Sequence, residues 1–400
     1  MLRDTAVSES PAPEIARGCA PSSWLRHLPA RHGTPVTRYQ MAVFLENAMR
    51  RTANWPPHTV LVFHHPAAEA NSDVNSGTEL LSLVAAIPSV GPEAPSASNP
   101  WLIKVGPGVY DLGSGSVTLP VYTSLEGAGQ STTVITAAGY SDKVHGTVIL
   151  GDHSRLSRLT VNNSGSSIYG IGAYLPSMGS EVAFEHVTLT ASSPSNGSGE
   201  SYCLLTDPNT SFSMVDCNLT AHGPATNWGI YATTSSAESR LDGVRVTVFG
   251  SNASNTSAGF VGYAASPVIR DSRFDISDSA NSVGIYVWGG GILDLRDSEI
   301  HNHGVGNGVE AAGVQVTLQN DIIISQLNAI FTSDDYPPGL SADINNCRVE
   351  GGTTWLHNEG PYTVTVGASK LVGATTNLFG GTASCFGNYT GSVFLANTCP

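Results

Sequence analysis

A repeat of about 26 residues constrains the fold of this chain more than any other feature of its sequence. Short segments such as RLTV (158–161), HVTL (186–189) and DSRF (271–274) recur, and each ends in an apolar residue. The residues that end these segments are Val161, Leu189, Leu219, Val246, Phe274, Ile300, Ile323, Val349 and Leu371. Between the segments lies a second apolar burst, as in YGIGAY (169–174) and VGIYVW (283–288). A period between about 20 and 50 residues indicates stacked repeats, each of which buries its apolar face against its neighbours.

Alternation within these segments predicts β-strands with one buried face. The last position is apolar throughout, the position before it is mostly polar, and the position before that is small or apolar except at Asp321. A period of two is typical of a strand, and no helix is patterned between the bursts. We therefore expect an all-β fold, a single-stranded right-handed parallel β-helix, preceded by a small, partly helical N-terminal region. In QNDIIIS (319–325) the polarity reverses, which predicts a β-bulge.

Composition divides the chain into three segments. Residues 1–55 contain TPVTRYQMAVFLENAMRR, in which apolar residues at helical spacing follow Thr37 as an N-cap. Residues 56–100 contain a second expected helix, ELLSLVAAI (79–87), and then a linker rich in Pro, Ser and Ala. The repeat is uniform over the remainder, so we assign residues 101–400 to the β-helix.

The charge of the chain argues against two classes of partner. Its net charge is −14 at pH 7, and only 12% of its residues are charged. Because residues 1–51 hold seven Arg and four acidic residues, the rest of the chain is more acidic still. Such a body repels nucleic acid and anionic membranes, and it repels polyanionic polysaccharides unless a cation such as Ca²⁺ bridges them. We expect no membrane span, because no stretch reaches about 18 apolar residues.

The six cysteines lead to three expectations. No CxxC pair is present, so we expect no zinc site and list no metal ligand. Cys217 and Cys347 fall in an inward column, where they serve as small buried hydrophobes. Cys385 and Cys399 flank FGNYTGSVFLANT, and their spacing fits either a loop-closing disulfide or two free thiols.

Two stretches resemble known families. IKVGPGVY (103–110) and LEGAGQSTTVI (125–135) resemble the first coil of bacterial pectate-lyase-like β-helix proteins, in which I.V.PG.Y precedes an L.G.G...T.I rung. This resemblance covers about 300 residues and implies the β-helix fold. GCAP and TPVTRYQMAVFLENAM, within residues 18–49, resemble the end of an S-layer homology repeat. Both resemblances imply a secreted or cell-surface protein, although MLRDTAVSES at the start lacks the shape of a signal peptide.

Candidate catalytic residues are few. Asp334 and Asp335, in TSDDY (332–336), are paired carboxylates at the end of a strand burst, and such pairs suit glycoside hydrolysis. Adjacent strand residues point to opposite faces, so solvated turn residues are the alternative. The DFIFG element of pectinesterases and the RxPxxR element of pectate lyases are both absent.

Aromatic residues in the apolar bursts are the first candidates for binding. They are Trp228, Tyr231, Tyr286, Trp288 and Trp355. Alternation turns one member of each pair outward, where its ring can stack on a sugar. Packing of the rings at a coil corner is the alternative.

Basic residues of an outward column are the second candidates. Arg245 and Arg273 begin this column, which continues through Arg348 and Lys370 and is interrupted by Glu299. These side chains either pair with an anionic sugar or only solubilise the protein.

Two classes of function follow from these features. The first is an extracellular or cell-surface scaffold, glycan-binding or adhesive and non-catalytic, which the partial S-layer-like element and the scarcity of Lys favour. The second is a polysaccharide lyase or glycoside hydrolase of the pectate-lyase-like class. Both have a polysaccharide or cell-wall glycan as partner, and neither needs a cofactor apart from Ca²⁺, which stays open. The sequence leaves the oligomeric state undetermined.

Overall fold

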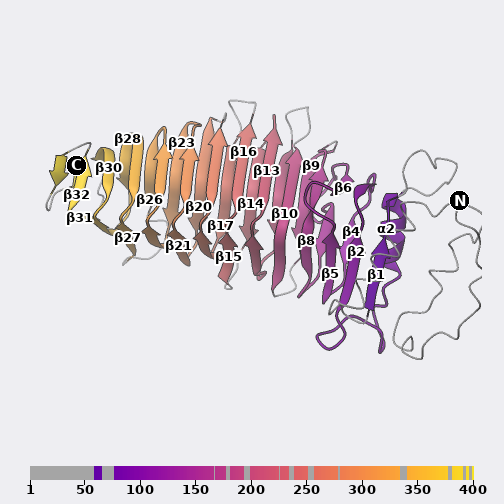
Figure 1. Cartoon of the computed structure of the whole chain (residues 1–400). Coiled ribbons are helices and arrows are strands. Elements are labelled where there is room, and N and C mark those ends of the chain that lie inside the picture. Colours follow the sequence, from indigo (N-terminus) through magenta and orange to yellow (C-terminus); the bar gives the residue numbers. More distant parts are fainter. Residues whose placement is uncertain are drawn as a thin grey trace, which may run out of the picture.

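Parallel pairing between consecutive coils builds the whole described fold, seen in a computed structural model of the chain (Figure 1). It describes residues 58–64, 76–165, 167–176, 181–192, 199–224, 226–233, 238–250, 256–277, 280–333, 340–376, 381–390, 393–395 and 399–400. The coils stack into an elongated solenoid, so the predicted all-β parallel β-helix is confirmed. Among the described strands, only β32 and β33 pair in antiparallel fashion, at the C-terminal end.

Each coil contributes strands to three parallel sheets. Sheet 1 contains β1 (His58–Val62), β2 (Trp101–Val105), β5 (Thr123–Gly127), the first half of β8 (Arg155–Asn163) and of β10 (Val182–Ser192), β12 (Phe212–Val215), β15 (Glu238–Asp242), β18 (Ser266–Arg270), β21 (Ile292–Arg296), β24 (Gln315–Gln319), β27 (Ser341–Asn345), β29 (Thr363–Gly367) and β31 (Thr382–Phe386). Sheet 2 contains β3 (Gly108–Asp111), β6 (Thr133–Ala137), the second halves of β8 and β10, β13 (Asn218–Gly223), β16 (Arg245–Gly250), β19 (Arg273–Ser277), β22 (Glu299–Asn302), β25 (Ile322–Ser325), β28 (Arg348–Asn358), β30 (Lys370–Thr376) and β32 (Asn388–Thr390), with β33 (Val393–Leu395) beside it. Sheet 3 contains β4 (Val117–Leu119), β7 (Val148–Leu150), β9 (Tyr169–Leu175), β11 (Glu200–Thr206), β14 (Thr226–Thr233), β17 (Thr256–Tyr263), β20 (Asn281–Trp288), β23 (Gly306–Ala312) and β26 (Asn328–Ser333), and it ends on β28 and β30.

The apolar column that ends the sequence repeats forms the inner wall of sheet 2. Its members face one another across consecutive coils, as in the pairing of Leu219 with Val246, of Val246 with Phe274, and of Phe274 with Ile300. All nine predicted members are buried in the hydrophobic core. Because period-two alternation places every second side chain inside, this column could be identified before the structure was known.

The first residue of every repeat makes the corner between sheets 1 and 2. These residues all have positive φ angles: Arg158, His186, Asp216, Gly243, Asp271, Asp297, Asn320, Asn346 and Ala368. Asp, Asn and Gly adopt this left-handed conformation more readily than other residues do. Their frequency at the corner therefore explains why the repeats so often begin with one of them.

A ladder of side-chain hydrogen bonds runs along the next position of this corner. The Val244 N–H donates to Ser272 Oγ (3.1 Å), the Ser272 N–H to Ser298 Oγ (3.1 Å), and the Ser298 N–H to Asp321 Oδ1 (2.9 Å). Each inward oxygen thus accepts from the backbone of the preceding coil, which satisfies a donor that the sharp corner would otherwise leave unpaired. Asp321 is a buried carboxyl group in this ladder, with 1% of its surface exposed.

The β-bulge predicted in residues 319–325 is wrong. β25 continues the register of its neighbours, with Ile322 opposite Glu299 and Ile323 opposite Ile300. The reversed polarity arises because Asp321 takes the place of serine in the corner ladder, not because a residue is inserted. Register shifts occur instead between β28 and β30, near Thr354.

The solenoid begins earlier than the sequence repeat suggests. β1 pairs in parallel with β2, so residues 58–62 of the expected linker provide a first strand of sheet 1. The helix expected at 79–87 is present as α2 (Ser76–Ala85), which buries Leu80 and Leu83. Among the described residues, no helix is long and apolar enough to span a membrane. The S-layer-like helix within residues 1–55 lies outside the described part of the chain.

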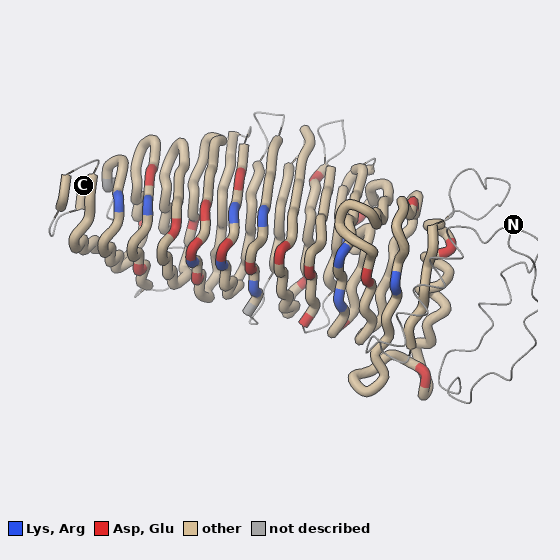
Figure 2. The backbone as a smooth tube through the Cα atoms, in the orientation of Figure 1, with Lys and Arg blue, Asp and Glu red and all other residues tan. Residues whose placement is uncertain are grey.

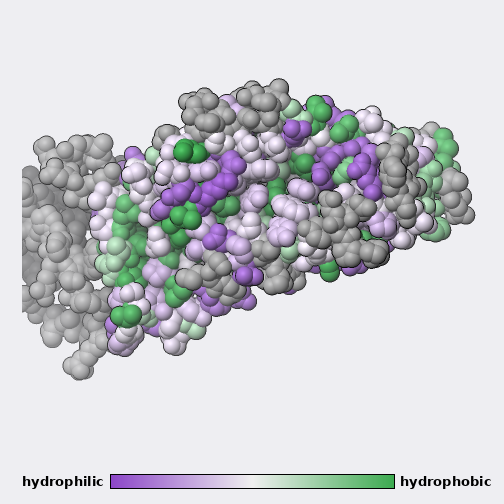
Figure 3. Space-filling view, turned by 180° about the vertical axis from the view of Figure 1, so that it is seen from behind, coloured by the Kyte–Doolittle hydropathy of each residue, from purple (hydrophilic) through white to green (hydrophobic). Residues whose placement is uncertain are grey.

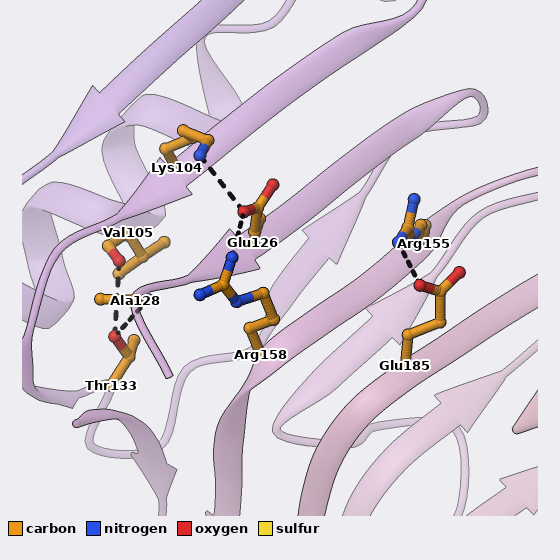
Figure 4. Close-up of polar contacts among 8 residues, drawn as sticks. All are labelled: Lys104, Val105, Glu126, Ala128, Thr133, Arg155, Arg158 and Glu185. Carbon is orange, nitrogen blue, oxygen red and sulfur yellow. Dashed lines mark hydrogen bonds and ion pairs between the residues drawn. The ribbon is translucent and has the colours of Figure 1, made fainter. Parts of the chain in front are cut away.

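Ion pairs link neighbouring coils on the outside of sheet 1 (Figure 4). Lys104 Nζ lies 3.2 Å from Glu126 Oε1, and Arg158 Nη1 lies 3.7 Å from the same oxygen. Arg155 pairs with Glu185 one coil further on. Opposite charges on adjacent strands stabilise the stacking by a modest amount, about 0.2–1 kcal/mol for each pair.

The cysteines behave as the alternation indicates, and we expect the inward pair to be unreactive in the folded protein. Cys217 and Cys347 are buried, and burial raises the pKa of Cys217 to about 11 and that of Cys347 to about 12. Thiolates are the reactive species, so a maleimide should label neither residue until the protein unfolds. Labelling of native protein, followed by peptide mapping, checks this, and rapid modification of both would contradict the assigned inward column.

Cys385 and Cys399 form a disulfide, which settles the alternative left open by their spacing.

Candidate functional site

A second hydrophobic cluster lies on the outer face of sheet 3, separate from the core of the solenoid. It consists of Ile171, Tyr174, Tyr202 and Leu205, with Tyr169, Trp228, Tyr231 and Ile149 packed against it. An outer face of a coil wall is normally polar, so apolar and aromatic side chains there are informative. Seen from behind, hydrophobic residues form several separate patches between hydrophilic ones, so this surface carries no single large apolar face (Figure 3).

The backbone of sheet 3 explains why these rings point outward. In β11, Cys203 and Leu204 are part of the core, whereas Tyr202 and Leu205 on either side belong to the outer cluster. Two consecutive inward residues between two outward ones recur in register along the sheet, with Tyr202 opposite Trp228 and Leu205 opposite Tyr231. The outward residues of β9, β11, β14, β17, β20, β23 and β26 are called the aromatic face below.

Two groups of rings occupy consecutive rungs of the aromatic face. In the first ring group, the centroids of Trp228 and Tyr231 are 5.6 Å apart, and those of Tyr202 and Tyr231 are 5.8 Å apart. In the second ring group, Tyr286 stacks on Trp288 with centroids 4.6 Å apart, and Tyr263 lies 5.4 Å from Trp288. The rings therefore continue from β11 to β20, along the direction of the solenoid axis.

Lys143 contacts the first ring group at its N-terminal end. Its Nζ lies 5.2 Å from the centroid of the Tyr169 ring and 5.3 Å from that of Tyr202, and it also pairs with Glu200. Tyr202 donates a hydrogen bond to Glu200, and burial together with this carboxylate raises the pKa of Tyr202. The cation and the rings attract each other, so this end of the face is held in a fixed arrangement.

Glu310 interrupts the rings. It lies on β23 opposite Tyr286 of the preceding coil and Phe331 of the following coil. Among the described strands of sheet 3 from β9 to β26, β23 is the only one that carries no aromatic residue within its bounds. Burial raises the pKa of Glu310, a hydrogen bond from Asn307 lowers it, and the negative charge of Glu359 raises it further. A carboxyl group with a raised pKa is thus set between aromatic rings.

Four of the five predicted aromatic residues lie together. Trp228, Tyr231, Tyr286 and Trp288 are all half-buried residues of the aromatic face. Neither member of each pair turns inward, although we expected one outward ring in each pair. Trp228 and Tyr231 are separated by two inward residues, and Tyr286 and Trp288 by one, Val287, so that both members of each pair face outward. Whether these rings bind a glycan stays a prediction.

The expected exposure of Trp355 is wrong. This side chain is fully buried, 0% exposed, in the hydrophobic core. It occupies one of the two consecutive inward positions of its burst, next to Leu356, and the preceding coils have Ala329 or Gly308 at this position. Trp355 therefore fills the interior near the C-terminal end and cannot offer its ring to a ligand.

Arg245 and Arg273 lie on sheet 2, on a different face from the rings. The predicted column is confirmed, because Arg245 is opposite Arg273, which is opposite Glu299. Figure 2 shows it as a row of blue bands, interrupted by red, that crosses the sheet. Arg273 bonds to Asp275 (2.7 Å) and to Glu299 (2.8 Å), and these contacts hold its charge within the row. The structure thus does not bring the two Arg residues together with the candidate rings.

Asp334 and Asp335 lie outside the described residues. They follow directly after Ser333, the last residue of β26, which carries Phe331 on the aromatic face.

Several residues of the aromatic face were missed by the sequence analysis. Tyr202 lies in the burst SYCLLT, which has no Gly-Ile core to align it with the others, and Glu310 lies in GVEAAG. Extending the column of Tyr231 and Tyr286 by one repeat would have placed Glu310 in line with them. The described residues contain no group of three or more His, Cys, Asp or Glu side chains arranged to hold a metal ion.

Comparisons with known proteins give structural neighbours only. No protein-family model and no curated protein matches the chain. The A-module of the mannuronan C-5 epimerase AlgE6 from Azotobacter vinelandii is similar at 15% identity with a TM-score of 0.49, over 79% of this chain and 95% of that chain. Pectate lyase Pel9A is similar at 15% identity with a TM-score of 0.44, over 83% and 79%. The catalytic unit of the GH87 alpha-1,3-glucanase from Streptomyces thermodiastaticus is similar at 14% identity with a TM-score of 0.42, over 86% and 68%. With TM-scores below 0.5, these similarities carry no conclusion about what this chain binds or does.

Proposed function

We propose that the aromatic face binds an extended polysaccharide. The observation that supports this most directly is the succession of rings on neighbouring coils, from Tyr202 to Trp288, all on one outer face. Consecutive rungs are about 4.8 Å apart, and the rings occupy neighbouring columns on successive rungs: Tyr231 and Tyr286 share one column, with Val261 between them, and Tyr263 and Trp288 share the next. A chain of sugar rings has apolar faces at intervals and matches such an elongated band, whereas a compact ligand would need a closed pocket.

The compartment that we propose is extracellular. The disulfide between Cys385 and Cys399 supports this location, because disulfides persist in oxidising environments and are rare in the cytosol. An extracellular or surface location also gives the protein access to polysaccharide.

Binding should depend on the second ring group. We expect Trp288→Ala to weaken binding of the preferred glycan by about 30-fold, because truncation of a central aromatic anchor costs about 2 kcal/mol or more. A panel of polysaccharides, tested by affinity electrophoresis and then by calorimetry, identifies the glycan and measures the loss.

Phe249→Ala is the matched control for this experiment. Phe249 is 38% exposed and stacks on His222, with centroids 5.2 Å apart, but it lies on sheet 2. It should leave the affinity unchanged within about twofold. Equal losses in both variants, or no glycan binding by the parent protein, would show that the aromatic face is not a binding surface.

A non-catalytic scaffold and a polysaccharide-acting enzyme would both use such a face. No observation on the described residues favours a purely adhesive role. Glu310 favours the enzyme, because a carboxyl group with a raised pKa between rings suits acid–base chemistry rather than adhesion.

A further inference from the structure

Glu310 is positioned by a chain of side-chain hydrogen bonds that crosses three coils. Thr354 Oγ1 donates to Asn328 Oδ1 (2.6 Å), Asn328 Nδ2 donates to Asn307 Oδ1 (2.9 Å), and Asn307 Nδ2 donates to Glu310 Oε2 (2.8 Å). Among the described residues, Glu310 Oε1 has no hydrogen-bond partner. One carboxyl oxygen is thus held in place, while the other is left for a ligand.

A second carboxyl group lies on the same face, two rungs away. Glu359 follows β28, and its N–H donates to Thr332 O (2.8 Å), which continues the pairing of β28 with β26. Its Oε1 lies 2.7 Å from His357 Nε2, and the His357 ring stacks on Phe331, with centroids 5.1 Å apart. Glu310 is in line with Phe331 and His357, and Glu359 lies two residues further along the chain than His357. Two rungs (about 10 Å) and two residues along a strand (about 7 Å) place the two backbones about 12 Å apart. The carboxyl groups of inverting glycosidases are about 6.5–9.5 Å apart, a separation that two glutamate side chains extending from these backbone positions can span.

The surroundings of Glu310 raise the pKa of its carboxyl group. The side chains that face Glu310 come from β20 (Tyr286), β23 (Asn307), β26 (Phe331) and β28 with its following residues (His357 and Glu359). None of them is a Lys or Arg that would hold Glu310 ionised. Its partial burial and the nearby Glu359 carboxylate both act in the direction of a neutral Glu310.

The charge of this face also restricts the glycan. No Lys or Arg occurs in β9, β11, β14, β17, β20, β23 or β26, and the neighbouring Lys143 is already paired with Glu200. Of the acidic side chains, Glu200 is the partner of Lys143, whereas Glu310 and Glu359 have no Lys or Arg partner among the described residues. A polyuronate would meet repulsion here and would find no counterion, so a neutral glycan is favoured. β-Elimination is disfavoured for the same reason, since it needs a uronate whose carboxyl group acidifies the neighbouring C–H.

We propose that Glu310 and Glu359 form a hydrolytic site for a neutral polysaccharide, with Glu310 as the acid and Glu359 as the base; this rests on the proposed binding function of the aromatic face. The Glu310 carboxyl group gives its proton to the glycosidic oxygen as the bond from that oxygen to the anomeric carbon breaks. A water molecule attacks the anomeric carbon from the opposite side and gives its proton to the Glu359 carboxylate. The products are two sugar chains, one with a new reducing end, and no oxidant or cofactor takes part.

The test uses the full chain with neutral glucans, xylan and mannan on one side and polygalacturonate and alginate on the other. We expect new reducing ends from a neutral glycan, and neither reducing ends nor ultraviolet-absorbing unsaturated products from the uronates. Glu310→Gln should lower turnover at least 100-fold, within the range of general acid catalysis, and should change the affinity for the same glycan less than threefold. Glu359→Gln should behave in the same way. Glu299→Gln, an outward glutamate of sheet 2, is the control and should keep full turnover.

A titration provides a readout that does not depend on the choice of glycan. In protein labelled with ¹³C at the glutamate carboxyl carbons, the resonance lost in Glu310→Gln should titrate above the range of the other glutamates. Tight binding of a glycan without any turnover, or turnover that survives Glu310→Gln, would overturn the hydrolytic site and leave the binding function in place. Absence of glycan binding would instead reject the binding function, and the hydrolytic site with it.

Discussion

The Asp321→Asn variant should be more stable than the parent protein at pH 8 by about 3 kcal/mol. Burial raises the pKa of Asp321 to about 7, against 3.8 for a free aspartate, in spite of hydrogen bonds from the Ser298 and Gln319 N–H groups. Each pKa unit corresponds to about 1.4 kcal/mol, so ionisation of the folded protein costs about 4 kcal/mol. Loss of the Gln319 hydrogen bond (2.8 Å) reduces the gain by about 1 kcal/mol.

The gain in stability from Asp321→Asn should disappear at low pH. The folded protein binds the Asp321 proton more tightly than the unfolded chain does, so Asp321 makes the parent less stable as pH rises from about 4 to 7. At pH 4 the carboxyl group is neutral in the folded state, and the variant should then be equal to the parent or less stable by about 1 kcal/mol. Urea unfolding at pH 4.5 and pH 8 measures both differences.

Asparagine is a suitable replacement because the same ladder already contains one. Asn388 holds the equivalent position in the last coil, where its Oδ1 accepts from the Ser369 N–H (2.8 Å) and its Nδ2 donates to Val366 O (3.0 Å). Asp343→Asn, on the outer face of β27, is the control and should change the free energy of unfolding by less than about 0.5 kcal/mol at either pH. A gain at pH 8 that is equal in both variants would point to the overall negative charge instead of Asp321.

Trp355→Ala should lower the free energy of unfolding by about 3–5 kcal/mol. The side chain is fully buried in the core, so its removal loses apolar burial and leaves a cavity that the coil can only partly close. Its effect on glycan affinity should be negligible under conditions where the protein stays folded, since the ring does not reach the surface. Thermal unfolding and the glycan assay together distinguish the two residues: Trp355→Ala should lower stability but not affinity, whereas Trp288→Ala should lower affinity.

Trp355→Phe tests the cause of this loss. The buried Nε1–H of Trp355 has no hydrogen-bond partner, so the indole retains a desolvated donor. Phenylalanine keeps much of the apolar volume and removes this donor, and we expect a change within about 1 kcal/mol. A loss as large as that of the alanine variant would mean that the precise shape of the indole, rather than apolar burial, stabilises the C-terminal coils.

An adhesive scaffold and a polysaccharide-acting enzyme place different demands on the aromatic face. A face that only adheres needs rings and a regular spacing, both of which β11 to β20 provide. The proposed hydrolytic site further uses the hydrogen-bond chain that ends on Glu310, because catalytic sites hold carboxyl groups with shifted pKa values in place. Loss of turnover with unchanged affinity in Glu310→Gln is therefore the measurement that distinguishes the two.

The repeat in the sequence determined the coil, its inner wall and its corner. The column from Val161 to Leu371 is buried as predicted, because period-two alternation is a local property that one segment encodes without knowledge of its neighbours. The inward Cys217 and Cys347 follow from the same rule. The corner residues carry a local signal too, since Asp, Asn and Gly accept the left-handed conformation that the bend requires.

Only the tertiary structure decided which side chains share the outer face of sheet 3. Each burst there places two consecutive residues inward, so simple alternation fails at Trp355, which is buried, and at Trp228 and Tyr231, which both face outward. The partners of Glu310 come from three coils, at Tyr286, Phe331 and Glu359, and its raised pKa arises from their combined burial and charge. Such a property depends on the register between coils, which stacking fixes and which no single repeat contains.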